Sequence, residues 1–198
     1  MPEMSAPTRR FRCRARHQNR RGRRASPLRY DLIRILIADD NHHMRVLLTE
    51  ILRAIGVVHI HEAADGAQGL QMLRNHQVDI VMTDLSMQPL DGIDFVRLLR
   101  NSPDSPNQMI PVIMITGHST MRRVAEARDA GVNEFLAKPL TARGVLERIA
   151  RIVEHPRPFI RTADYFGPDR RRRADPAYAG PWRRSTDAAI ALSHPIDE

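Results

Sequence analysis

The chain is short of cysteine, lysine and long apolar runs, and these shortages exclude several classes of protein. Its 198 residues include one cysteine, Cys13, so no disulfide can form within the chain. No apolar run is long enough to span a bilayer. No apolar segment follows Arg9-Arg10, as a secretory signal would require. These absences favour a cytoplasmic protein.

Motifs of common enzymes are also absent. The sequence has no Cys-x-x-Cys pair, no glycine-rich phosphate loop and no Gly-x-Ser-x-Gly. His42 and His43 are adjacent, and neighbouring side chains on a helix point in different directions. This favours solvent-exposed residues at a helix start over a metal site. His61 and His76 are isolated in the sequence and indicate little.

Arginine carries almost all of the positive charge. There are thirty arginines and one lysine, Lys138, which precedes Pro139. Lysine offers a compact ammonium on a flexible stem, whereas arginine presents a planar fork. The single lysine is either a chance survivor of an arginine bias or a position that needs an ammonium group. The residues that end the predicted strands favour the second explanation.

Four short apolar runs, typical of strands buried in a parallel sheet, each end in polar residues. The runs are 33–38, 78–83, 110–115 and 132–137, and they are followed by Asp39-Asp40, Asp84, Thr116-Gly117 and Lys138. The ligand crevice of such sheets lies at the carboxyl ends of the strands. Three carboxylates, a hydroxyl and an ammonium are therefore expected to converge at one edge of the sheet.

Segments with helical periodicity separate these runs. They are residues 42–55, 67–75, 91–100, 119–130 and 141–153, and a further strand is expected at 57–63. Gly56 and Gly131 favour helix ends, and Thr141 favours a helix start. Strict alternation of five strands and five helices predicts an α/β doubly wound fold with right-handed crossovers.

Residues 31–154 resemble the receiver domain of bacterial two-component response regulators. The resemblance rests on Asp39-Asp40, Asp84, Thr116 and Lys138-Pro139, with support from Asp91-Gly92 and Asp65-Gly66-Ala67. It covers about 124 of the 198 residues. The resemblance implies a flavodoxin-like, five-stranded parallel sheet of order 2-1-3-4-5 flanked by five helices.

The resemblance implies that Asp84 is a phosphoacceptor. It would take a phosphoryl group from a phosphohistidine of a histidine kinase or phosphotransfer protein. A hard divalent cation prefers oxygen ligands. Mg²⁺ would therefore be held by Asp39, Asp40, Asp84 and the backbone carbonyl of Ser86. Asp39 and Asp40 could instead form a helix N-cap pair, but capping alone does not explain the other strand-end groups.

The resemblance also gives roles to residues around the acceptor. Lys138 would stabilise charge on the phosphoryl oxygens, and Thr116 would hydrogen-bond one of them. Phe135 stands where the family has a switch aromatic that turns inward on phosphorylation, although a half-buried strand aromatic is the simpler alternative. Ser86 and His118 occupy the positions that tune dephosphorylation. Neither is a carboxylate or amide that would orient water well, so a long-lived aspartyl phosphate is predicted.

The two ends of the chain are basic and lack helical or strand periodicity. Residues 1–30 contain ten arginines and one acidic residue, which predicts a disordered, non-globular arm. Segment 31–154 has a net charge of −3, so the +8 of the whole chain comes from its ends. The arm would contact nucleic acid or anionic lipid, or it is an artefact of the assigned translation start.

Residues 155–198 form an arginine-rich tail, expected to be non-globular, in which one pattern occurs twice. Tyr-x-Gly-Pro-x-Arg-Arg begins at Tyr165 and again at Tyr178, an interval of thirteen residues. Arginine pairs and a Gly-Pro turn suit a linear docking element for nucleic acid or an acidic partner. They equally suit a strap that packs back onto the domain. The tail has no pattern of a helix-turn-helix or enzymatic output domain.

The sequence therefore predicts a stand-alone response regulator that is not an enzyme beyond weak autophosphatase activity. It would signal through phosphorylation-dependent protein contacts at its fourth helix, fifth strand and fifth helix. Candidate residues there are Arg122, Arg123, Arg128, Phe135 and Arg143. Two alternatives remain: a nucleic-acid-binding regulator that acts through its arginine-rich ends, and an unphosphorylated scaffold.

Overall fold

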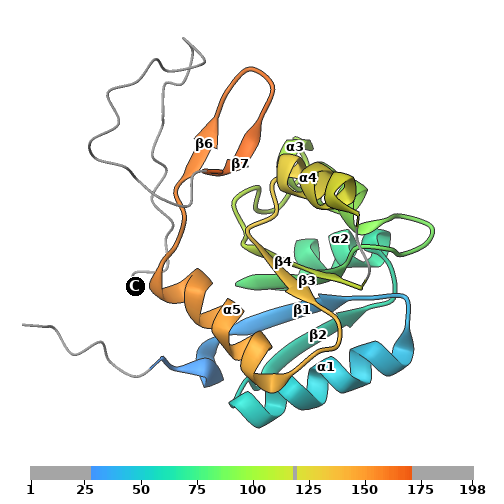
Figure 1. Cartoon of the computed structure of the whole chain (residues 1–198), viewed down its shortest axis with the longest axis vertical. Coiled ribbons are helices and arrows are strands. Elements are labelled where there is room, and N and C mark those ends of the chain that lie inside the picture. Colours follow the sequence, from blue (N-terminus) through green and yellow to red (C-terminus); the bar gives the residue numbers. More distant parts are fainter. Residues whose placement is uncertain (1–27, 118–119, 171–198) are drawn as a thin grey trace, which may run out of the picture.

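The computed structural model describes residues 28–117 and 120–170. Its main sheet has five parallel strands in the order β2-β1-β3-β4-β5 (Figure 1). The strands are β1 Arg34–Ala38, β2 His59–Ala63, β3 Ile80–Asp84, β4 Val112–Thr116 and β5 Glu134–Ala137. The predicted flavodoxin-like sheet order is confirmed.

Five α-helices alternate with these strands, and a short 3-10 helix, η1 Tyr30–Leu32, precedes β1. The α-helices are α1 His42–Ile55, α2 Gly66–Asn75, α3 Gly92–Asn101, α4 Met121–Ala130 and α5 Ala142–Glu154. Each begins with a side-chain cap, from Asn41, Asp65, Asp91, Thr120 and Thr141 respectively. Gly56 and Gly131 end α1 and α4 with φ of 103°, the left-handed conformation that glycine adopts freely.

The sheet separates two hydrophobic clusters, and alternate residues of each strand enter different clusters. In β1, Leu36 and Ala38 face the side covered by α2, α3 and α4. Ile35 and Ile37 face the side covered by α1 and α5 (Figure 1). Both faces of the sheet are therefore buried, which explains why its strands are nearly continuous apolar runs in the sequence.

A second, two-stranded antiparallel sheet follows α5, and the sequence did not predict it. Its strands are β6 Phe159–Arg161 and β7 Phe166–Pro168 (Figure 1). Tyr165 and Phe166 are buried, so residues 165–170 of the first copy pack back onto the domain as a strap. The N-terminal arm up to residue 27, and the second copy of the pattern, lie outside the described residues.

Within the described part of the chain, no helix combines the length and apolar character that a membrane span requires. Two peptide bonds that precede proline, Gln88–Pro89 and Lys138–Pro139, are cis.

Candidate functional site

The five strand-end residues singled out in the sequence lie at the same edge of the sheet. Asp39 and Asp40 follow β1, and Asp84 is the last residue of β3. Thr116 is the last residue of β4, and Lys138 follows β5. The register pairs Ala38 with Thr83, Asp84 with Ile115, and Thr116 with Ala137. Parallel pairing therefore brings these strand ends together, as predicted.

Both carboxylate oxygens of Asp84 are engaged. Oδ1 lies 2.7 Å from the Lys138 ammonium nitrogen. Oδ2 accepts a 2.7 Å hydrogen bond from the Ser86 backbone N–H. Asp84 is buried, whereas the Lys138 side chain is 29% exposed. The Asp84 carboxylate is therefore fixed in direction by a backbone donor and neutralised by a lysine that reaches it from solvent.

Asp39 and Asp40 lie beside this pair, one buried and one exposed. Asp39 Oδ2 is 3.9 Å from Lys138 Nζ, and its Oδ1 accepts a hydrogen bond from Asn41 N–H. Burial raises the pKa of Asp39 and Asp84 raises it further, while the Asn41 hydrogen bond and Lys138 oppose the rise. Asp40 Oδ2 accepts a 3.3 Å hydrogen bond from Gln88 N–H. Negative charge is thus concentrated at this edge.

The oxygen donors of Asp39, Asp40 and Asp84 fit a hard divalent cation. Within residues 28–117 and 120–170, no three His, Cys, Asp or Glu side chains form a metal-binding cluster. Mg²⁺ does not need such a cluster, because it is usually held by one or two carboxylates together with water. The Lys138 ammonium already lies between Asp84 and Asp39. The site therefore has an arrangement of carboxylates that calls for positive charge.

The remaining sequence-predicted residues are placed as follows. Thr116 is buried, and its carbonyl accepts a 2.8 Å hydrogen bond from Lys138 N–H. Phe135 is half-buried and packs against the hydrophobic cluster beneath α2, α3 and α4. The side chain of Ser86 is exposed, beside the acceptor loop. His118 lies outside the described residues.

Asp91 and Gly92 connect this edge to α4. Gly92 must be a glycine, because a Cβ there would collide with the carbonyl oxygen of Asp84. Asp91 caps α3 and pairs with Arg123 of α4 at 3.0 Å. Burial alone would raise the pKa of Asp91, but hydrogen bonds from Asp94 N–H and Arg123 hold it below its ordinary value. An ion pair therefore connects the loop after Asp84 to α4.

Sequence reasoning missed Arg45, which supports the acidic pocket from α1. Its Nη1 donates a 2.8 Å hydrogen bond to the carbonyl oxygen of Asp39, and its Nε lies 3.3 Å from Glu62 Oε2. Thr49 donates to the same glutamate. Arg45 and Thr49 are four residues apart and share a helix face, which was the available signal. Among thirty arginines, that signal is weak.

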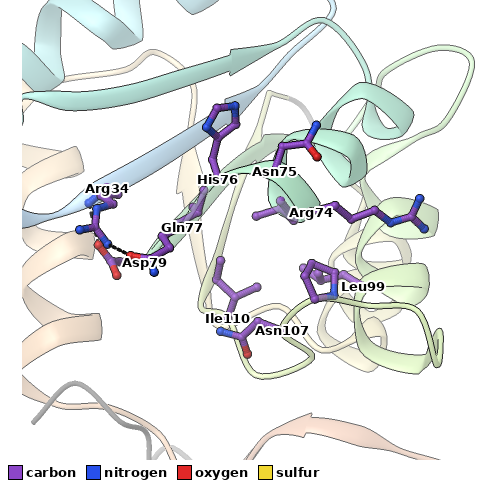
Figure 2. A pocket seen from close by; sticks show the side chains of 12 residues that line it. Arg34, Arg74, Asn75, His76, Gln77, Asp79, Leu99, Asn107 and Ile110 are labelled. Carbon is purple, nitrogen blue, oxygen red and sulfur yellow. Dashed lines mark hydrogen bonds between the residues drawn. The ribbon is translucent and has the colours of Figure 1, made fainter.

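A cavity of about 430 Å³ lies away from this site, at the amino ends of β1, β3 and β4. Figure 2 shows Arg34, Asp79 and Ile110 beside it, with Arg74 and His76 from the end of α2. None of the strand-end acidic residues, Thr116 or Lys138 lines it. The charged strand-end groups therefore converge outside this cavity.

The chain is similar to known proteins in sequence and in fold. The family model for the response regulator receiver domain matches residues 35–150. The chemotaxis protein CheY of Pseudomonas aeruginosa is 37% identical over 122 residues, which are 62% of this chain and 97% of CheY. CheY-3 of Vibrio cholerae is also 37% identical over 122 residues, 62% of this chain and 92% of that protein. A solved receiver protein from Pseudomonas putida superposes with a TM-score of 0.54 at 26% identity, covering 60% of this chain and 96% of that one.

Proposed function

Because the chain belongs to the family of response regulator receiver domains, we propose that it accepts a phosphoryl group on Asp84. The donor is a phosphohistidine of a histidine kinase or a histidine phosphotransfer protein. The pairing of Asp84 with Lys138, the chain's single lysine, carries the proposal. A carboxylate at the end of a central strand, with an ammonium at 2.7 Å, is arranged to accept a phosphoryl group.

The transfer is a single displacement at phosphorus. Asp84 Oδ1 attacks the phosphorus atom, and the phosphorus–nitrogen bond of the phosphohistidine breaks. The imidazole nitrogen keeps the bonding electron pair and takes a proton, so an acyl phosphate and a neutral histidine result. Oδ2 stays hydrogen-bonded to Ser86 N–H, which holds the attacking group in place. Lys138 neutralises charge on the phosphoryl oxygens, and Thr116 hydrogen-bonds one of them.

The reaction also needs a cation, because a phosphoryl donor and three carboxylates repel one another. Asp39, Asp40, Asp84 and the carbonyl of Ser86 would hold Mg²⁺, which supplies charge neutralisation between phosphate and protein. Arg45 keeps this arrangement in place by binding the Asp39 carbonyl. Lys138 and a bound Mg²⁺ would therefore both neutralise the negative charge at this edge of the sheet.

The output of the switch is a change in protein contacts at α4, β5 and α5. Thr116 and Phe135 would couple the phosphoryl group to this face. Arg123 already links α4 to the loop after the acceptor through Asp91. Met121 at the start of α4 is 85% exposed and offers an apolar contact. A partner that binds one arrangement of this face better than the other shifts the equilibrium between them.

Phosphorylation of the full chain with a small-molecule phosphoryl donor and Mg²⁺ tests the proposal. Mass spectrometry should locate one hydroxylamine-labile phosphoryl group on Asp84, and Asp84→Asn should abolish it. Asp79→Asn, which alters a carboxylate at the opposite end of β3, should leave the labelling intact. Absence of labelling on Asp84 would favour the scaffold alternative.

The lifetime of the aspartyl phosphate is a separate test. Ser86 offers no carboxylate or amide to orient water, so decay of the aspartyl phosphate within seconds would contradict the expected long lifetime.

A further inference from the structure

The first copy of Tyr-x-Gly-Pro-x-Arg-Arg is held by a surface at the far end of the domain from Asp84. We call the surface formed by Arg100, Asp129, Gly131 and Phe159 the seat. Arg100 is fully buried at the end of α3, and its guanidinium lies 5.0 Å from the centre of the Phe159 ring. Its nitrogens donate to the carbonyl oxygens of Gly131 and Gln108 and to Asn133 Oδ1. The strap covers this buried cation.

The glycine of the pattern is required by the seat. A Cβ on Gly167 would lie 2.9 Å from the Cα of Gly131 and 2.6 Å from the Tyr165 hydroxyl oxygen. Both distances are shorter than real Cβ contacts. The strap and the α4–β5 corner thus approach backbone to backbone, and only glycine permits this at position 167.

The tyrosine, proline and arginine of the pattern also have defined contacts. The Tyr165 hydroxyl donates a 2.8 Å hydrogen bond to the Pro168 carbonyl. The Arg170 guanidinium lies 3.9 Å from the centre of the Tyr165 ring and 3.2 Å from Asp129 Oδ1. Tyr165, Gly167, Pro168 and Arg170, which are common to both copies, are therefore the residues that shape the turn and attach it to the seat.

The copies differ at two positions, which are Phe166 and Asp169 in the first copy. Asp169 uses its backbone N–H and C=O to bind Pro158 and Arg157, and the equivalent Trp182 has the same backbone groups. Phe166 packs its ring against Phe159 and beneath Arg161. Its equivalent in the second copy is alanine, so the second copy lacks one ring but keeps the tyrosine, the glycine, the proline and the first arginine of the pattern.

We propose that residues 178–183 are a second, weaker occupant of the seat, which replaces residues 165–170 on the same molecule. β6 would remain in place and pair with the second copy. The connection from β6 would then be thirteen residues longer. Loop-closure entropy rises only with the logarithm of loop length, so this extension is tolerated. The exchange would release Arg170 from Asp129 and free the basic run 170–173 for other contacts.

Trp182 is the only tryptophan and lies within the second copy, so it reports occupancy of the seat directly. In the full chain, Gly167→Val blocks the first copy through the close approach to Gly131. We expect the Trp182 emission to shift to shorter wavelength and to lose acrylamide quenching in this variant. Unchanged emission and quenching would overturn the proposal.

Two further variants make the result specific. Adding Gly180→Val to Gly167→Val should restore the emission and quenching of the wild-type chain, because neither copy then fits the seat. Phe166→Ala makes the two copies alike at that position, so it should give a partial shift even if Gly167→Val does not fold. A shift that grows with protein concentration would show exchange between molecules and would contradict occupation within one chain. The inference does not depend on phosphorylation.

Discussion

Lys138 Nζ lies 2.7 Å from Asp84 Oδ1, although Asp84 ends β3 and Lys138 follows β5, the strands on either side of β4. An ammonium on a four-carbon stem reaches across that strand and presents a compact charge to one oxygen. A guanidinium would present a broader, planar group at the same place. This relationship gives a physical reason for one lysine among thirty arginines.

Replacement of that lysine by arginine should therefore impair phosphorylation despite the unchanged charge. In Lys138→Arg we expect the rate of Asp84 labelling by a small-molecule donor to fall about 100-fold, the scale of removing one preorganised charge-stabilising donor. Rates are measured by mass spectrometry at fixed Mg²⁺. Arg143→Lys, an exposed change on α5, should have no effect. Equal rates in Lys138→Arg and the wild type would show that the ammonium geometry is unimportant.

Mg²⁺ binding should depend on the buried carboxylate next to the acceptor. Asp39→Asn should weaken Mg²⁺ binding by at least about tenfold in calorimetric titrations, because a neutral amide replaces a charged ligand. Removal of Mg²⁺ with a chelator should stop labelling of Asp84 in the wild-type chain. The matched control is Asp94→Asn, an exposed carboxylate on α3 that pairs with Arg97. A chain that labels at full rate in the chelator would exclude the metal role.

Phe135 should couple phosphorylation to partner binding without taking part in the transfer. Phe135→Ala is expected to be labelled on Asp84 normally but to lose partners that bind only the beryllofluoride-activated chain. Because the ring is half-buried, the variant should also lose about 1–2 kcal/mol of stability, below the cost of a fully buried ring. Captures from native lysate with and without beryllofluoride provide the comparison. Unchanged activation-dependent capture would mean that Phe135 is only a packing residue.

The fold and the convergence of the strand-end residues could be predicted because both follow from local sequence patterns. Short apolar runs indicate strands buried on two faces, and the β1 residues that face both clusters bear this out. Polar residues at the strand ends then converge through parallel pairing alone. The strand predicted at 57–63 begins two residues later, at His59. Val57 and Val58 belong to the connection after Gly56.

The pairing of β6 with β7 and the buried arginine could not be predicted from such patterns. β6 and β7 have three residues each, too few for any periodicity. Arg100 is buried because oxygens from Gln108, Gly131 and Asn133 meet around it. In the sequence, nothing separates it from the other arginines. Whether an arginine is buried depends on partners that are distant in the sequence. In a chain with many arginines, the sequence alone therefore does not show that Arg100 is the buried one.

Stability should fall in mildly acidic solution because of a stacked histidine pair. The rings of His61 and His76 are 4.4 Å apart between centres. Burial lowers the pKa of His61, and His76 and His59 lower it further. Since the unfolded chain binds the proton more readily, this contribution is complete above about pH 6.5 and is lost as the pH falls from there toward the lower folded pKa.

Urea unfolding between about pH 7.5 and pH 5.5 measures this loss. His61→Gln should flatten the dependence of the unfolding free energy on pH across that range. His42→Gln, at the exposed start of α1, should leave the slope as in the wild type. If the His61→Gln variant retains the wild-type slope, other groups are responsible.

Residues 156–170 should behave as part of the folded domain. Phe159 is 2% exposed and lies between the Arg100 guanidinium and the Phe166 ring. Burial lowers the pKa of Arg100 to about 9, so the group stays charged at neutral pH and needs its surrounding contacts. Phe159→Ala should therefore lower the unfolding free energy by about 3–5 kcal/mol. Ile160→Ala, a half-buried neighbour, should cost less. Equal and small losses of unfolding free energy in both variants would mean that residues 156–170 pack on the domain without stabilising it.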